Sequence, residues 1–177
     1  MLFRSFWLGR SPGNAVINLD ALTYAGDRAS LADVEGSAGA RYRFVHGDIA
    51  DLDLVRRTLS SGRPDAIVNF AAESHNSRAV LDPGVFMRTN ALGTQMLLEA
   101  ARLEGTARFH HISTCEVYGD LALDSAEVFT EESPYRPRTP YNASKAAADL
   151  IVRAYRETFG LPVTISNCAN KIGRAHV

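Results

Sequence analysis

The segment FHHISTCEVYG, residues 109–119, begins as a β-prone apolar run and ends in residues that can move protons. Short apolar runs of this kind recur along the chain and are typical of buried parallel strands. The expected strands are Val16–Leu19, Arg43–His46, Ala66–Phe70, Phe109–Ser113 and Val163–Ser166. Helical patterns at roughly 51–60, 84–104 and 141–159 separate several of them. This alternation predicts an α/β fold, a doubly wound parallel sheet with helices on its faces.

Polar side chains follow the expected strands at their carboxyl ends. In doubly wound sheets, ligands bind in the crevice outside these ends. The residues that fall there are Asp20, Asp48, Ala71–Ser74 and Thr114–Glu116. We therefore expect one ligand site along this edge of the sheet.

The run Tyr141-Asn-Ala-Ser-Lys145 places a phenol and an ammonium four residues apart on one face of an expected helix. A lysine about one turn away would lower the phenol pKa, so the tyrosine could take a proton from an alcohol near neutral pH. A Tyr-x-x-x-Lys pattern alone is weak evidence, since a core aromatic and a solvated lysine also produce it. Together with the cluster at 114–116, it indicates dehydrogenase-type chemistry.

Composition limits the possible partners. With 19 basic and 20 acidic residues in 177, the net charge of −1 offers no electrostatic case for a nucleic acid or an anionic membrane. The apolar runs are far too short to span a bilayer, and the N-terminus lacks a signal-peptide core. The two cysteines, Cys115 and Cys168, do not suggest a disulfide framework, and the histidines form no metal-ligand pattern. We expect one cytoplasmic domain without a metal.

Several long motifs follow one another along the chain: VINLDALTYAG at 16–26, RYRFVHGDI at 41–49, FAAESH at 70–75 and the opening segment at 109–119. In this order they resemble the NAD-dependent sugar-nucleotide epimerases and dehydratases, which are extended short-chain dehydrogenase/reductases. Within that family they are similar to the dTDP-glucose 4,6-dehydratases. The resemblance covers about residues 6–170 and implies a partial NAD-binding Rossmann domain.

The resemblance implies a lyase that converts dTDP-glucose to dTDP-4-keto-6-deoxyglucose, with NAD as a transiently reduced cofactor. It also implies a homodimer of the full-length protein, formed through the helices at 84–104 and 141–159. Two alternatives remain open. One is a related NAD-dependent sugar-nucleotide dehydratase, decarboxylase or epimerase, and the other is an inactive fragment or a non-enzymatic paralogue.

Matching positions carry the family's roles to this chain. The implied catalytic residues are Thr114, Cys115, Glu116, Tyr141 and Lys145. The implied cofactor contacts are Asp20, Ala21, Leu22, Thr23, Asp48, Ile49, Phe70, Ala71, Ala72, Glu73, Ser74, Thr89, Tyr141 and Lys145. The implied substrate contacts are Ser74, Thr114 and Asn170. For Ser74 and Thr89, helix capping is an equally good interpretation.

Position 115 departs from the family, because Cys115 stands where an aspartic acid normally protonates the departing hydroxyl. A thiol is protonated at neutral pH but is a weak hydrogen-bond donor. Three interpretations remain open: the thiol is the acid, Glu116 handles both proton transfers, or Cys115 only packs.

Both ends of the chain also depart from the family. The family's first strand and Gly-rich phosphate turn would lie before residue 1, and most of the C-terminal substrate domain is lacking. Residues 1–5 and 171–177 resemble translated sequencing-adapter DNA and are expected to be non-native ends. We expect such a fragment to be inactive alone.

Overall fold

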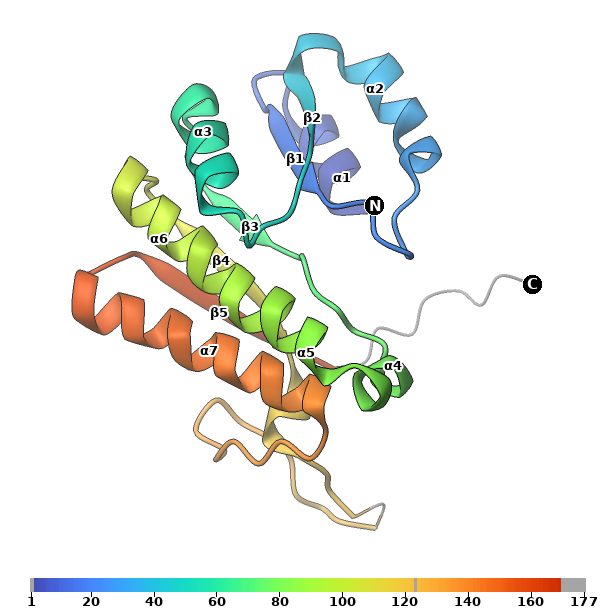
Figure 1. Ribbon diagram of the computed structural model, residues 1–177, viewed down its shortest axis with the longest axis vertical. Coiled ribbons are helices and arrows are strands. Elements are labelled where there is room, and N and C mark those ends of the chain that lie inside the picture. Colours follow the sequence, from blue (N-terminus) through green and yellow to red (C-terminus); the bar gives the residue numbers. More distant parts are fainter. Residues whose placement is uncertain (1, 123, 170–177) are drawn as a thin grey trace.

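The computed structural model describes residues 2–122 and 124–169 and shows an α/β fold (Figure 1). Its strands are all parallel. They are β1 (Val16–Asp20), β2 (Tyr42–His46), β3 (Ile67–Asn69), β4 (Phe109–Thr114) and β5 (Val163–Cys168). Its α-helices are α1 (Leu2–Arg10), α2 (Ala32–Ala38), α3 (Leu52–Gly62), α4 (Asn76–Leu81), α5 (Pro83–Phe86), α6 (Thr94–Glu104) and α7 (Pro140–Phe159). The remaining described helical segments are the 3₁₀ turns η1 (Arg28–Leu31), η2 (Gly39–Arg41) and η4 (Cys115–Tyr118), and the π-helical segment η3 (Met87–Gly93).

Helices lie on both faces of the sheet formed by β1 and β2, as the sequence predicted. Side chains alternate across a strand, so Val16 of β1 packs with the residues of α1 and α2, whereas Leu19 packs against the main core. Figure 1 shows α3, α6 and α7 lying side by side along that second face. The expected doubly wound arrangement is confirmed.

The strands form two sheets. β1 pairs with β2, with Asp20 opposite His46, and β3, β4 and β5 form a second sheet in that order. Within residues 2–122 and 124–169, no ladder joins β1 to β3. β3 is also shorter than the expected Ala66–Phe70, and after it the Ala71 amide donates to the Asn69 side chain at 3.1 Å.

The expected helix at 84–104 contains three different helical segments. Pro83 occupies the first turn of α5, where its missing N–H costs nothing. A π-helical segment, η3, follows and leads into α6, which ends at Gly105 with a positive φ of 70°. A Cβ on Gly93 would lie 2.7 Å from the Ile49 side chain, so the close approach of η3 to that residue requires glycine.

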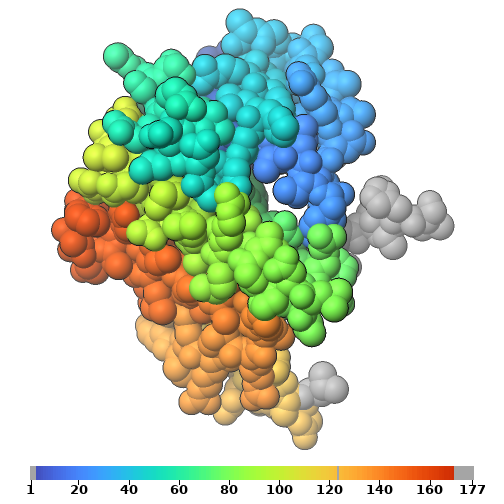
Figure 2. Space-filling model, in the orientation of Figure 1, coloured from blue at the N-terminus to red at the C-terminus, as the bar shows by residue number. Residues whose placement is uncertain are grey.

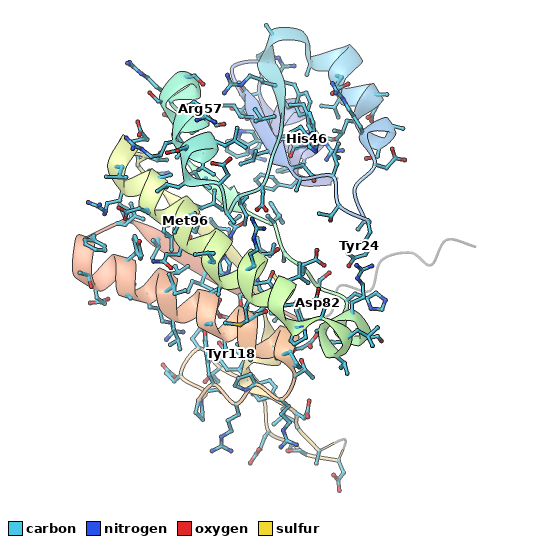
Figure 3. The ribbon with its side chains drawn as sticks, in the orientation of Figure 1. Tyr24, His46, Arg57, Asp82, Met96 and Tyr118 are labelled. Atoms are coloured by element: carbon cyan, nitrogen blue, oxygen red, sulfur yellow. The ribbon has the colours of Figure 1, made fainter. Side chains whose placement is uncertain are left out.

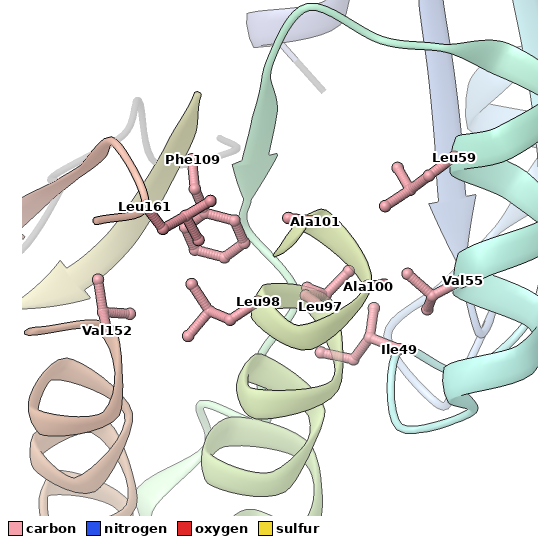
Figure 4. Close-up of a cluster of buried hydrophobic side chains, with 10 residues drawn as sticks. All are labelled: Ile49, Val55, Leu59, Leu97, Leu98, Ala100, Ala101, Phe109, Val152 and Leu161. Carbon is pink, nitrogen blue, oxygen red and sulfur yellow. The ribbon is translucent and has the colours of Figure 1, made fainter. Parts of the chain in front are cut away.

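The main core lies between the helices and the second sheet (Figure 4). Its buried members are Ile49, Val55, Leu59, Leu97, Leu98, Ala100, Ala101, Phe109, Val152 and Leu161. Leu98 and Val152 are fully buried, from α6 and α7 respectively. Truncating such a leucine to alanine typically costs about 2–5 kcal/mol. This core fixes α7 against β4 and β5.

Helix α7 is delimited by strong local signals. The Thr139 hydroxyl accepts from the Asn142 amide at 3.1 Å, Pro140 opens the first turn, and Gly160 ends the helix with φ 66°. Residues 119–122 and 124–139, between η4 and α7, project from the body of the molecule (Figure 2 and Figure 3). Among the described residues, no helix has the length and apolarity needed to cross a membrane.

Candidate functional site

The loops that leave β1 and β2 meet at the carboxyl ends of these strands, because the Gly47 amide donates to the Asp20 carbonyl at 3.0 Å. Asp20 is exposed, and its Oδ1 accepts from the Leu22 amide at 2.8 Å. Leu22 itself has a positive φ of 46°. The exposed Ala21 and Thr23 flank it, so the implied cofactor residues 20–23 form one tight surface turn.

Asp48 is held by partners on both of its oxygens. Oδ1 accepts from the Ala50 amide at 2.8 Å, and Oδ2 pairs with the Arg88 guanidinium of η3. Burial opposes ionisation of Asp48, but the amide and the guanidinium outweigh it and lower the pKa. The neighbouring Ile49 side chain lies in the main core, so only its backbone is available to a ligand.

Residues 70–74 form the loop that follows β3. Phe70 is half exposed and its ring lies 5.3 Å from that of Phe3. Ala71 is half-buried, whereas Ala72 and Ser74 are exposed. The Glu73 backbone is held at both of its polar groups by the buried Asn90, which accepts from its N–H and donates to its C=O, both at 2.9 Å.

The second half of the site follows β4. Thr114 ends the strand, and its hydroxyl accepts from the Glu116 amide at 3.3 Å. Glu116 Oε2 accepts from Asn76 of α4 at 3.4 Å, and Asn76 in turn accepts from the Thr139 hydroxyl at 3.1 Å. Cys115 is half-buried and packs against the apolar cluster that contains Val117 and Tyr118. The carboxylate is thus tied to the start of α7.

Tyr141 lies in the first turn of α7 and packs edge to face with Phe86, at 6.3 Å between ring centroids. Burial raises its pKa, the Glu116 carboxylate adds to the rise, and a hydrogen bond with Thr114 opposes it. The expected lowering of the phenol pKa by lysine is therefore wrong for this arrangement. The reason is that the Lys145 ammonium bonds the Ile112 carbonyl at 2.7 Å.

Lys145 is almost fully buried, with 3% of its surface exposed. Burial lowers its pKa to about 8, although Asp149 and Cys168 act in the opposite direction. Its ammonium also lies 3.4 Å from Nε2 of His111, a fully buried residue of β4. The site thus places Thr114, Glu116 and Tyr141 at the end of β4, with a buried cation behind them.

Comparison with known proteins places this geometry in a family. A sequence model described as GDP-mannose 4,6 dehydratase matches residues 7–176. The chain belongs to this family. It is 52% identical over 162 residues to a dTDP-glucose 4,6-dehydratase from Mycobacterium tuberculosis, covering 92% of this chain and 47% of the relative. It is 46% identical over 179 residues to dTDP-glucose 4,6-dehydratase 1 of Escherichia coli K12, covering 92% and 49%. The chain therefore spans about half the length of these curated relatives.

Solved structures of a dehydratase and an epimerase agree with these sequence matches. DesIV, a dTDP-glucose 4,6-dehydratase from Streptomyces venezuelae solved with NAD and TYD bound, superposes with a TM-score of 0.86 at 48% identity. The match covers 98% of this chain and 51% of that one. A UDP-glucose 4-epimerase from Thermus thermophilus in complex with NAD gives a TM-score of 0.80 at 30% identity, covering 92% and 49%.

For this member of the GDP-mannose 4,6-dehydratase family, the structure separates the implied site residues into groups. Thr114, Glu116, Tyr141 and Lys145 come together, and Asp20 lies beside the Asp48 loop. Thr89 is half-buried in η3 rather than at a helix cap, and Ser74 caps no helix. Asn170 lies outside the described residues. In the described part of the chain, no cluster of three or more His, Cys, Asp or Glu side chains could hold a metal.

Sequence reasoning missed three buried polar residues that support the site: Asn90, His111 and Asp149. Asn90 bridges the Glu73 loop to Ser144 of α7, to which it donates at 2.8 Å. Asp149 had a readable signal, since it falls four residues after Lys145 on the same helix face. For His111 the signal was weaker, namely a histidine at a core position of an alternating strand.

Proposed function

We propose that the protein containing this chain dehydrates dTDP-glucose to dTDP-4-keto-6-deoxyglucose, using NAD that is regenerated in each cycle. The observation that carries the proposal is the arrangement at the end of β4. The Thr114 hydroxyl accepts from the Glu116 amide at 3.3 Å, and the Tyr141 phenol lies within electrostatic reach of both side chains. Relatives that are about half identical and carry this activity support the same assignment.

The residues present fit the two ends of a dinucleotide. The Asp20 carboxylate is exposed at a strand end, the position from which an acidic residue bonds a ribose hydroxyl. The Glu73 loop and Tyr141 border the end where the reaction would occur, and both are fixed from behind by Asn90 and Ser144. When bound, NAD supplies a hydride acceptor for the sugar C4 and returns the hydride to C6.

The chain's own residues would move the protons. Tyr141 takes the proton from the sugar O4, while the Thr114 hydroxyl bonds the same oxygen. The ketone formed at C4 acidifies the C5 proton, which Glu116 removes, and water leaves from C6. Cys115 or Glu116 protonates that leaving oxygen. A carboxylate at position 116 favours dehydration over simple C4 epimerisation, because the latter needs no C5 base.

A chimera tests the proposal without assuming what flanks this chain. Residues 6–169 replace the matching segment of the E. coli relative, and the product is assayed with dTDP-glucose by the alkali-induced absorbance of 4-keto sugars. We expect turnover, and a loss of about two to four orders of magnitude in Tyr141→Phe. Tyr155→Phe, far along the same helix, is the matched control. A folded chimera that prefers GDP-mannose, or an active Tyr141→Phe variant, would contradict the proposal.

For the 177-residue chain alone, we propose no turnover and at best weak NAD binding. The support is the separation of β1 from β3, which leaves strand edges without ladder partners between the two sheets. Calorimetric titration with NAD is the test, and micromolar binding would refute the proposal. We further propose a cytoplasmic homodimer for the complete protein, with the helical segments at 84–104 and 141–159 at the interface, to be tested by analytical ultracentrifugation.

A further inference from the structure

Asp149 presents a fully buried carboxylate whose two oxygens have different surroundings. Oδ2 accepts from Ser113 of β4 at 2.8 Å, from Tyr135 at 2.9 Å and from Asn167 of β5 at 3.1 Å. Oδ1 is buried and has no hydrogen-bond partner. Nε2 of His111 lies 3.4 Å from it. One oxygen thus binds the scaffold, and the other faces an imidazole.

The surroundings of His111 fix the position of its proton. Asn69 accepts from the Ala71 amide through Oδ1 at 3.1 Å, which sets the orientation of its side chain. Its Nδ2 donates to the Thr94 hydroxyl at 3.1 Å and lies 3.3 Å from His111 Nδ1. Nδ1 must therefore accept. Burial lowers the pKa of His111 to about 3, so the ring is neutral and carries its one proton on Nε2.

This tautomer determines what Lys145 can bind. An Nε2–H group cannot accept from the ammonium 3.4 Å away, so the ammonium donates to the Ile112 carbonyl at 2.7 Å. The same Nε2–H group faces Asp149 Oδ1, whose distance from the ring nitrogen is 3.4 Å. Cys168 on β5 also acts on the ammonium. Tyr141 lies one turn earlier on α7, and the Glu116 carboxylate of η4 acts on its phenol.

We propose that Asp149 is a positioning residue for Lys145. Its charge favours the protonated form of the buried ammonium, and its free oxygen faces the His111 nitrogen whose proton leaves the Ile112 carbonyl as the acceptor for the ammonium. Burial raises the pKa of the Asp149 carboxyl itself, while Ser113, Tyr135, Asn167 and Lys145 act in the opposite direction. Any consequence for catalysis rests on the proposed function, which places this buried cation behind Thr114, Glu116 and Tyr141. The electrostatic claim itself is independent of turnover.

The scarcity of lysine makes this claim measurable. Lys145 and Lys171 are the only lysines in the sequence, so Lys171→Arg leaves one. In that background, with lysine labelled by ¹³C and ¹⁵N, the NMR titration of the side chain gives the pKa of Lys145. We expect Asp149→Asn to lower this pKa by about two pH units. That is the effect of a unit charge at about 6 Å, the usual spacing of side chains four residues apart on a helix, at an effective dielectric constant of about 20.

The matched control is Tyr135→Phe, which removes one hydrogen bond to the same carboxylate but keeps its charge. It should shift the pKa by less than about 0.3 units. A merely structural Asp149 would instead give equal shifts in both variants, and no shift in Asp149→Asn would also overturn the proposal. If Asp149→Asn does not fold, the histidine ¹⁵N spectrum of the unsubstituted chain decides. A buried, non-titrating histidine protonated on Nδ1 refutes the proposal, and protonation on Nε2 supports it.

These outcomes are distinct from those of the proposed function. The chimera reports turnover, whereas the lysine titration reports a charge state in the 177-residue chain. An inert chimera with a shifted lysine would refute only the dehydratase assignment. An active chimera with an unshifted lysine would refute only the role of Asp149.

Discussion

The buried histidine of β4 makes the fold sensitive to acid, and His111→Gln tests this. In the folded chain the pKa of His111 is lowered from 6.5 to about 3, chiefly by burial, with Lys145 and His110 contributing. Below pH 6.5 the unfolded chain therefore binds a proton that the native chain does not. The free energy of unfolding must then fall as the pH falls, by up to about 1.4 kcal/mol per pH unit.

Integrated between pH 7.5 and 4.5, this loss of stability amounts to roughly 2.7 kcal/mol. A small domain is stable by only about 5–15 kcal/mol, so the loss is measurable. Urea unfolding followed by circular dichroism, at steps between pH 7.5 and 4.5, gives the slope directly. At pH 7.5 the free energy of unfolding of His111→Gln should be lower than that of the unsubstituted chain, because the variant loses buried contacts. On acidification to pH 4.5, however, it should fall by about 2.7 kcal/mol less than in the unsubstituted chain.

His110→Gln is the matched control on the same strand, where the ring contacts Thr164 and Ser166 side chains. It should keep the acid sensitivity of the unsubstituted chain. An unchanged slope in His111→Gln would refute the reasoning, because the proton uptake would then belong to other groups.

Three further outcomes are expected. In the chimera, Glu116→Gln should abolish exchange of the C5 proton with solvent while still allowing oxidation at C4, so reduced cofactor accumulates; normal deuterium entry at C5 would identify another base. Cys115→Ala should slow elimination and Cys115→Asp should preserve it if the thiol is the acid, whereas equal product formation rates in both would leave Cys115 as a packing residue. Gly119→Ala should lower the free energy of unfolding by about 1–3 kcal/mol, because φ is 95° and a Cβ would lie 2.8 Å from the Arg136 carbonyl; an unchanged urea midpoint would contradict this.

Much of the fold could be predicted because the signals were local. Short apolar runs located all five strands to within about two residues, and Thr139, Pro140 and Gly160 delimited α7 as capping rules require. The break between α5, η3 and α6 could not be read, because a π-helical segment keeps the apolar spacing almost intact. The separation of the strands into two sheets depends on pairing between distant segments, which periodicity does not encode.

The candidate site was likewise predicted only in part from the sequence. Residues at strand ends were found because parallel topology brings such ends together, and Thr114, Glu116 and Tyr141 do meet. The direction of the Tyr141 pKa shift was missed, because burial of the phenol and the Glu116 carboxylate set it. The Lys145 ammonium bonds the Ile112 carbonyl instead, which the Tyr-x-x-x-Lys spacing does not reveal. Whether the implied contacts bind NAD and substrate stays a prediction.

The wide turn of η3 has a consequence for how this helix can vary. A π-helical segment holds one residue more per hydrogen-bonded turn than an α-helix, so it acts as an insertion absorbed without a loop. Removing one residue from Met87–Gly93 would restore α-helical winding and turn residues within the segment by up to about 100°, while α5 and α6 on either side kept their positions. Asn90 would then face away from the Glu73 loop while Leu98 stayed in the core. Length changes here would therefore uncouple the loop from the core, whereas most substitutions would not.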